Sequence, residues 1–168
     1  LIVNIYTLYY LDDLNWNGKH IMNKGNDTDT DIEDNNNTTK KGFDYTPAWY
    51  NYRNNQRIGV AVANDPEGEW KRFDKPVLDV SSDSTANDAL MVSNPAVTVY
   101  KNSKVVLVYK QVAKKSGVLR GGKVRFGVAF SKSMIGPFNK HPEPIFQIKQ
   151  KDNENVWMIA EDPFLWSS

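Results

Sequence analysis

Two adjacent carboxylates near the end of the sequence are the residues best suited to catalysis. Glu161 and Asp162 stand directly before Pro163, and a short run suited to a β-strand follows. A pair of carboxylates can supply the acid and the base or nucleophile that cleave a glycosidic bond. Partial burial beside Trp157 and Trp166 would favour the protonated form that a general acid needs. The alternative is structural: the Asp-Pro step begins a strand after a turn, and Glu161 is its solvated neighbour.

An earlier stretch repeats this pattern with side chains that do not titrate. Ser93 and Asn94 stand directly before Pro95, which lies 68 positions before the later proline. An asparagine side chain both donates and accepts hydrogen bonds, as recognition of sugar hydroxyl groups requires. Ser93, Asn94 and Trp166 are therefore predicted to bind the substrate. The competing interpretation of Asn94 is a turn residue before a proline, and Asp88 is predicted to lie in a surface connection.

The offset of 68 relates a much longer part of the sequence. Residues 57–98, aligned without gaps on residues 125–166, show eight identities in 42 positions. Arg57 falls on Arg125, and both are predicted to have a structural ion-pair or packing role. One structural unit is therefore repeated, and the polar pair before the proline is where the two copies differ chemically.

Strand-like runs of β-branched and aromatic residues account for most of the repeated unit. The runs are 2–11, 57–63, 70–78, 95–100, 105–111, 123–131 and 138–146, together with residues from 163 onward. No helical periodicity is found in the sequence. Residues 12–46 are rich in Asn and Asp and are predicted to be a long exposed loop, with ordered structure beginning again at Pro47. Four strands repeated at a fixed period are typical of a propeller blade. The sequence therefore predicts an all-β protein that covers about two blades of a β-propeller.

The composition excludes several classes of function. A net charge of +1 supplies no field for nucleic acid or an anionic membrane, so neither is predicted as a partner. The absence of cysteine excludes disulfides, thiol catalysis and cysteine-based metal sites. His20 and His141 have no metal-ligand partner at a suitable spacing, so no metal and no cofactor is predicted. The composition does not choose between a periplasmic, extracellular or cytoplasmic location.

The combination of these motifs resembles the five-bladed β-propeller glycoside hydrolases. The motifs are Arg57-Ile58-Gly59-Val60-Ala61 with Gly68 and Trp70, then Ser93-Asn94-Pro95-Ala96-Val97, then Glu161-Asp162-Pro163-Phe164-Leu165-Trp166. This is the group around families 43, 32, 68 and 117, particularly the family 43-like or sucrase-like bacterial proteins. The resemblance covers about 1–11 and 47–166. It implies that residues 1–168 are a partial catalytic domain of a longer protein that is monomeric when complete.

The resemblance also implies roles for individual residues. Glu161 stands where the family has the general acid of a Glu-x-Pro motif, and Asn94 stands where many members have an aspartate that tunes the acid or stabilises the transition state. The first acidic residue of the family would lie before Leu1. In the family 117-like branch the acid is instead a histidine further downstream, beyond these residues, so the resemblance does not choose between Glu161 and Asp162 for the catalytic role. We expect this chain alone to be inactive and poorly soluble.

Two functions follow as expectations. The first is a glycosidase that cleaves O-glycosidic bonds of an oligo- or polysaccharide by paired carboxylates. The second is a carbohydrate-binding propeller module without catalysis, which is suggested by Asn94 at a position where an aspartate is common.

Overall fold

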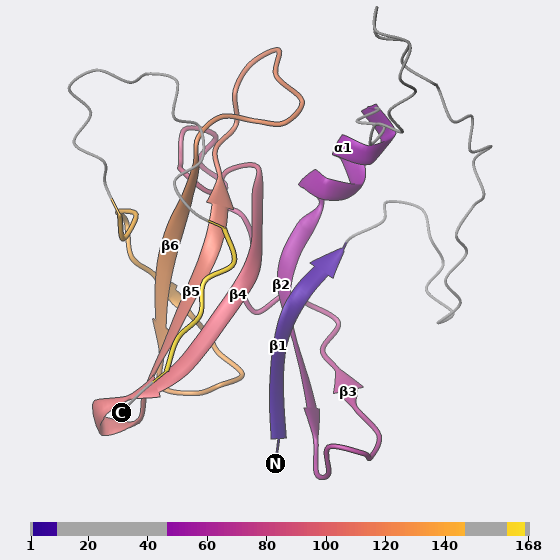
Figure 1. Cartoon of the computed structure of the whole chain (residues 1–168), viewed down its shortest axis with the longest axis vertical. Helices are drawn as coiled ribbons and strands as arrows, with labels where there is room; N and C mark the ends of the chain where they lie inside the picture. Colours follow the sequence, from indigo (N-terminus) through magenta and orange to yellow (C-terminus); the bar gives the residue numbers. More distant parts are fainter. Residues whose placement is uncertain (1, 10–46, 147–160, 167–168) are drawn as a thin grey trace, which may run out of the picture.

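The fold consists of two antiparallel β-sheets and one short helix (Figure 1). The computed structural model describes residues 2–9, 47–146 and 161–166. The first sheet contains β1 (Ile2–Tyr9), β2 (Gln56–Ala63) and β3 (Lys71–Arg72), in the order β1-β2-β3. The second sheet contains β4 (Met91–Tyr100), β5 (Lys104–Val112), β6 (Val124–Ser131) and β7 (Asn139–Lys140), in that order. The prediction of an essentially all-β chain is thus confirmed, as three strands followed by four.

The two sheets share one hydrophobic core. β4 packs against both β1 and β2. The core cluster combines buried side chains of both sheets: Ile58, Leu78, Val92, Leu107, Tyr109 and Ala129. Burying an aliphatic or aromatic side chain of this size contributes roughly 1.5–3 kcal/mol each. The sheets are therefore held face to face, and the ends of their strands are fixed relative to each other.

The 68-residue repeat predicted from the sequence is present in the backbone hydrogen bonds. Phe73 N–H donates to Val60 O, and His141 N–H donates to Val128 O, at positions 68 residues later. Three further features recur at the same offset. The turn hydrogen bond from Gly68 N–H to Asp65 O recurs from Gly136 to Ser133, and the strand pairing of Ala61 with Arg72 recurs as Ala129 with Lys140. The side chain of Arg57 donates to the backbone oxygen of the preceding residue, Gln56, as that of Arg125 donates to Val124 O. The two sheets are copies of one unit.

The outer strand of each unit is shorter than predicted. Runs 70–78 and 138–146 contain only the two-residue strands β3 and β7. Prolines at 76, 142 and 144 lack the N–H that continues a ladder. Isolated backbone hydrogen bonds still hold the rest of these segments beside the neighbouring strand, among them those from Val77 N–H to Ile58 O and from Ile145 N–H to Phe126 O.

The expectation that the chain contains no helix is wrong. Residues Pro47–Asn54 form the helix α1, which leads directly into β2. Proline is favoured at the first helical position because its missing N–H has no partner there in any helix. Two turns are too few to show a 3.6-residue periodicity in the sequence, which is why the pattern did not predict the helix.

The long loop predicted at 12–46 lies outside the described residues. Within them, no helix is long and apolar enough to cross a membrane.

Tyr109, at the centre of the core, gives the fold an expected dependence on alkaline pH. Burial raises the pKa of the Tyr109 hydroxyl, and the charge of Asp88 raises it further. The unfolded side chain ionises near pH 10, below the folded one, so this stabilisation is fully present below about pH 10 and is lost as the pH rises above it. We expect Tyr109→Phe to reduce the loss of unfolding free energy between pH 9 and pH 11. The control is Tyr100→Phe, at an exposed tyrosine, which should lose as much unfolding free energy between these pH values as the natural chain. Urea unfolding at each pH measures the loss. An equal loss in all three proteins would show that Tyr109 is not its source.

Candidate functional site

The site begins with a break in the regular pairing of β4. Ser93 pairs with Lys110 of β5, whereas Ala96 pairs with Val108, so β4 carries one extra residue between these points. This is a β-bulge, and Asn94 within it has a φ of 47°. A positive φ is uncommon outside glycine and is best tolerated by asparagine and aspartate. The predicted strand start at Pro95 is therefore wrong by four residues, because the strand runs through the bulge from Met91.

The later copy of the motif adopts the same unusual backbone conformation. Asp162 has a φ of 58° and directly precedes Pro163, as Asn94 precedes Pro95. The residue before a proline normally prefers extended backbone, so a positive φ at both equivalent positions is a shared feature of the two units. The repeat therefore preserves a backbone conformation as well as a sequence pattern.

The two equivalent residues are in contact. The Asn94 side-chain amide Nδ2 donates a hydrogen bond to Asp162 Oδ1. The Asp162 side chain is thereby attached to β4, although the residues are 68 positions apart in the sequence. The structure thus brings together the predicted substrate-binding residue Asn94 and the predicted catalytic residue Asp162.

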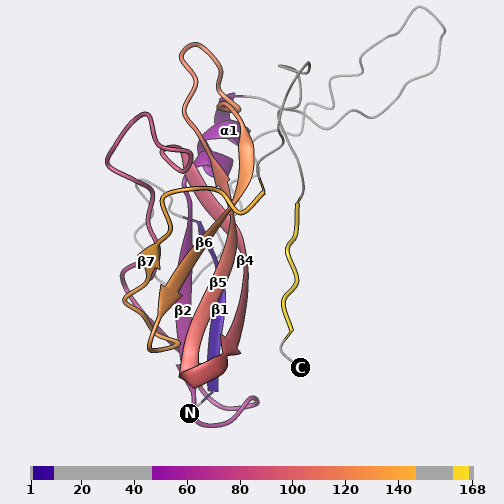
Figure 2. The same ribbon diagram turned by 90° about the vertical axis from the view of Figure 1, so that its left-hand side faces the viewer.

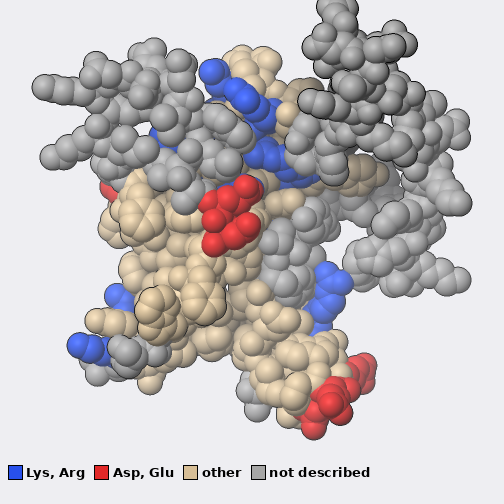
Figure 3. Space-filling model, in the orientation of Figure 1, with Lys and Arg blue, Asp and Glu red and all other residues tan. Residues whose placement is uncertain are grey.

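Glu161 is paired with a buried cation that the sequence did not point to. Lys110 Nζ of β5 forms an ion pair with Glu161 Oε1. The Lys110 side chain is only 10% exposed, whereas that of Glu161 is 43% exposed. A buried ammonium group requires a counter-ion, so Glu161 has a structural task in addition to any chemical one. Figure 3 shows acidic atoms beside basic atoms at the middle of this face, near where the described segment 161–166 begins in Figure 1.

The last turn of α1 places a second cation, Arg53, near the Lys110–Glu161 ion pair. Arg53 Nη1 donates to Asn54 Oδ1 (2.9 Å) and to the backbone oxygen of Arg120 (3.0 Å). Burial lowers the pKa of the Arg53 guanidinium, while the nearby charges of Tyr50 and Glu161 act in the opposite direction. Arg53 thus lies near Glu161 and ties α1 to the loop between β5 and β6.

The two aromatic residues after the motif are exposed. Phe164 and Trp166 are 80% and 77% exposed, and their ring centroids are 6.3 Å apart. Residues 161–166 lie outside both sheets, on the opposite side of the molecule from β7 (Figure 2). Trp166 therefore does not bury Glu161 as predicted, and the other proposed neighbour, Trp157, lies outside the described residues.

Two further polar residues are more buried than predicted. Ser93 is fully buried, and its hydroxyl has no hydrogen-bond partner among the described residues; its contact with substrate stays a prediction. Asp88 is 5% exposed and forms an ion pair with Lys140 of β7, so its prediction as a surface residue is wrong. The partner lies 52 positions away, a separation that a sequence pattern does not reveal.

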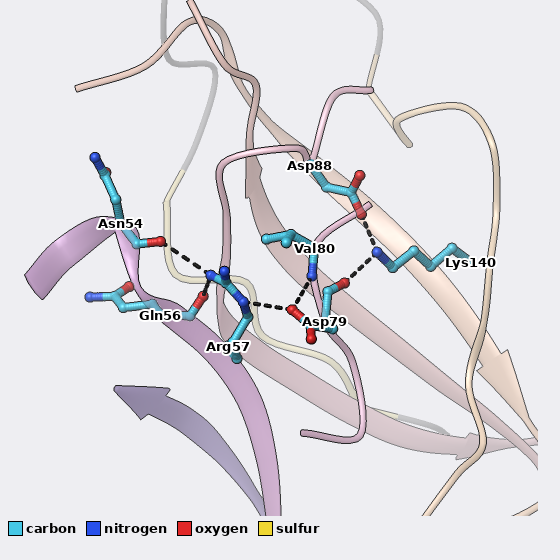
Figure 4. Close-up of polar contacts among 7 residues, drawn as sticks. All are labelled: Asn54, Gln56, Arg57, Asp79, Val80, Asp88 and Lys140. Carbon is cyan, nitrogen blue, oxygen red and sulfur yellow. Dashed lines mark hydrogen bonds and ion pairs between the residues drawn. The ribbon is translucent and has the colours of Figure 1, made fainter. Parts of the chain in front are cut away.

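Asp88 belongs to a line of polar contacts that joins the two units (Figure 4). Lys140 Nζ also donates to the backbone oxygen of Asp79. Asp79 Oδ1 forms an ion pair with Arg57 Nε of β2, at a distance of 2.6 Å. The structural ion pair predicted for Arg57 is thus present. These contacts share no residue with those of Asn94 and Glu161, and they hold β2, β7 and the connection before β4 together.

Comparisons with known proteins show a partial likeness to solved structures. No family model matches the chain, and no curated protein matches it. Among solved structures it is similar to Zg3597, a family 117 glycoside hydrolase produced by the marine bacterium Zobellia galactanivorans. The match has a TM-score of 0.43 and 27% identity, and it covers 52% of this chain and 23% of that one. The chain thus matches about a quarter of that enzyme's length, and a TM-score at this level assigns neither fold nor activity.

Proposed function

We propose that this chain is part of a β-propeller glycoside hydrolase that cleaves O-glycosidic bonds of an oligo- or polysaccharide. One observation carries the proposal: the repeat-equivalent residues Asn94 and Asp162 are hydrogen-bonded to each other and share a positive φ. In a propeller, the first strand of each blade lines the central channel, so residues at this position gather from every blade. A repeat that keeps its backbone and changes these side chains assigns them different roles around one channel.

The side chains at this position have the properties that glycosidic cleavage needs. Glu161 and Asp162 are exposed carboxylates, so a substrate can reach them. The contact with Lys110 is made by the ionised form of Glu161, which suits a base, a nucleophile or a stabiliser of positive charge at the sugar. Asp162, oriented by Asn94, is the second carboxylate. The general-acid role that the family resemblance gives to Glu161 would require a proton in place of this ion pair.

A carbohydrate-binding propeller without catalysis is the second candidate. The exposed pair Phe164 and Trp166 favours it, because aromatic faces next to hydrogen-bonding groups are suited to sugar rings. In this function Asn94 and Asp162 would bind hydroxyl groups, and the Lys110–Glu161 pair would be structural.

The two candidates are separated by measuring hydrolysis and binding on the same substrates. The protein that contains this chain is incubated with a panel of aryl glycosides and oligosaccharides, and released phenol and new reducing ends are followed. Hydrolysis of at least one substrate is the expected result. Calorimetric binding of an oligosaccharide without any product would overturn the hydrolase and support the binding module.

A further inference from the structure

We infer, on the basis of the proposed glycosidase function, that Arg53 of α1 and the basic loop, residues 113–123, bind an anionic group on the sugar substrate. The group is a carboxylate or a sulfate ester, and Arg53 and the loop together are called the anion site. The basic loop joins β5 to β6, and its charged residues are all basic: Lys114, Lys115, Arg120 and Lys123. In a chain of 21 basic and 20 acidic residues, this is a local excess of positive charge. A site beside such a loop favours a substrate that carries negative charge.

The basic loop lies next to the candidate site. β5 ends at Val112, two residues after Lys110, and the Lys110 ammonium group pairs with Glu161. The loop therefore begins close to the carboxylates that are proposed to cleave the substrate. In Figure 3, basic atoms extend from the acidic atoms at the middle of this face toward the region where Figure 1 shows the loop after β5. An anionic group on a sugar bound at the carboxylates is thus placed beside basic side chains.

Backbone hydrogen bonds give the basic loop a fixed shape. Ala113 N–H donates to Lys123 O at 3.2 Å, and Gly122 N–H donates to Ala113 O at 2.7 Å, so hydrogen bonds close the loop beyond the ends of β5 and β6. Gly121 has a φ of 81°, and a Cβ atom there would lie 2.4 Å from Leu90 Cδ2, so only glycine fits this position. The basic side chains therefore start from fixed backbone positions, which lowers the entropy cost of binding.

The last two residues of α1 attach the loop to the neighbouring unit. Asn54 Nδ2 donates to Leu119 O at 2.8 Å, and Arg53 Nη1 donates to Arg120 O at 3.0 Å. Arg53 Nη1 also donates to Asn54 Oδ1 at 2.9 Å. These acceptors are neutral oxygen atoms, so they position the half-buried guanidinium group of Arg53 without neutralising its charge. The planar fork of a guanidinium has further N–H donors, which suit the paired oxygen atoms of a carboxylate or a sulfate.

The positive charges around the carboxylates offset the repulsion that an anionic substrate would otherwise meet. Glu161 and Asp162 carry one negative charge each. Lys110 pairs with Glu161, and Arg53 lies near it, so these side chains are neutral in sum. The basic side chains of the loop are exposed and add further positive charge. An uncharged sugar gains nothing from this charge, whereas an anionic sugar is attracted to it.

The test compares three forms of each sugar. Every aryl glycoside and oligosaccharide of the hydrolysis panel is supplied with a hydroxyl, a carboxylate or a sulfate ester at C6, and kcat/KM is measured with the protein that contains this chain. We expect a carboxylated or sulfated form to have the highest kcat/KM, and the better of the two identifies the group. Arg53→Gln should lower the ratio of kcat/KM between that form and the uncharged form by about ten- to a hundredfold, the usual effect of losing a hydrogen bond to a charged group.

Two further variants separate the effect of charge from that of folding. Lys71→Gln removes one positive charge from an exposed residue of β3, outside the anion site, and should leave the ratio unchanged. Lys114→Gln/Lys115→Gln removes two charges from the loop and keeps the contacts of α1, so it tests the anion site even if Arg53→Gln does not fold. It should lower the ratio by about two- to fivefold per lysine, because exposed ion pairs contribute less.

The outcomes separate the anion site from the glycosidase. Equal kcat/KM for the charged and uncharged forms, or an equal loss on both in Arg53→Gln, would overturn the anion site and leave the glycosidase standing. If no form is cleaved, the glycosidase is refuted, and calorimetry with the same oligosaccharides decides on the anion site. Tighter binding of an anionic form that Arg53→Gln weakens would support it, whereas equal binding of all forms, or no binding, would overturn it.

Discussion

Replacing Gly127 by alanine is expected to lower the free energy of unfolding by about 2–3 kcal/mol, the upper part of the range for overpacking a core. A Cβ atom at this position would lie 2.4 Å from Tyr109 Cζ and 2.7 Å from Gln111 Oε1. The Tyr109 ring is 1% exposed and packs in the core between the two sheets, so it cannot move aside freely. The predicted loss is measured by urea unfolding monitored by tryptophan fluorescence.

Two further variants separate this clash from the general effect of replacing a glycine. Gly117→Ala introduces a methyl group with no atom within 4 Å, at a φ of 68°, and should cost only the left-handed strain of about 1 kcal/mol. In a Tyr109→Leu background the ring is gone, so Gly127→Ala should cost much less than in the natural chain. A destabilisation that stays the same in that background would show that the ring contact is not its cause. Because Gly59 pairs with Tyr6 in the equivalent register, the same pairing of tyrosine and glycine marks both units.

The parts of the fold that local sequence specifies were predicted correctly. β2, β5 and β6 were found within one residue of each end, because runs of β-branched residues bounded by turn residues have few other stable conformations. The 68-residue repeat was predicted from only eight identities in 42 positions. It was detectable because Arg57, Gly59 and Gly68 recur for backbone and packing reasons that tolerate few other residues. Whether these units close into a propeller remains a proposal, since closure depends on contacts beyond the two sheets.

The parts that depend on distant contacts could not be predicted. The bulge at Asn94 has no signature beyond an asparagine before a proline, because the extra residue is defined only by the pairing with β5. Lys110 directly follows the continuous apolar run 105–109 of β5. A lysine is almost never buried without a partner, and the partner of Lys110 is Glu161, 51 positions away in the sequence. A lysine that falls on the buried face of a predicted strand is the one signal that could have identified it.

Glu161→Gln is expected to reduce kcat/KM for glycoside hydrolysis by about a hundred- to ten-thousand-fold, the usual contribution of a positioned acid or base. The reason is that the amide retains the size of the side chain and loses its charge and proton affinity. Initial rates on an aryl glycoside and on an oligosaccharide measure this loss. Glu69→Gln is the matched control, since Glu69 is an exposed glutamate in the connection between β2 and β3 and its replacement should leave the rates unchanged.

The ion pair with Lys110 makes a second variant necessary, because Glu161→Gln also leaves a 10% exposed ammonium group without its counter-ion. Removing one partner of such a pair should lower the free energy of unfolding by about 2 kcal/mol, less than for a fully buried pair because Glu161 is partly exposed. In the double variant Lys110→Met/Glu161→Gln the unpaired charge is gone, so stability should return toward that of the natural chain. Activity should remain lost if Glu161 touches the substrate. If the double variant recovers both stability and activity, Glu161 is only the counter-ion of Lys110, and Asp162 is then the carboxylate to which the chemistry must be assigned.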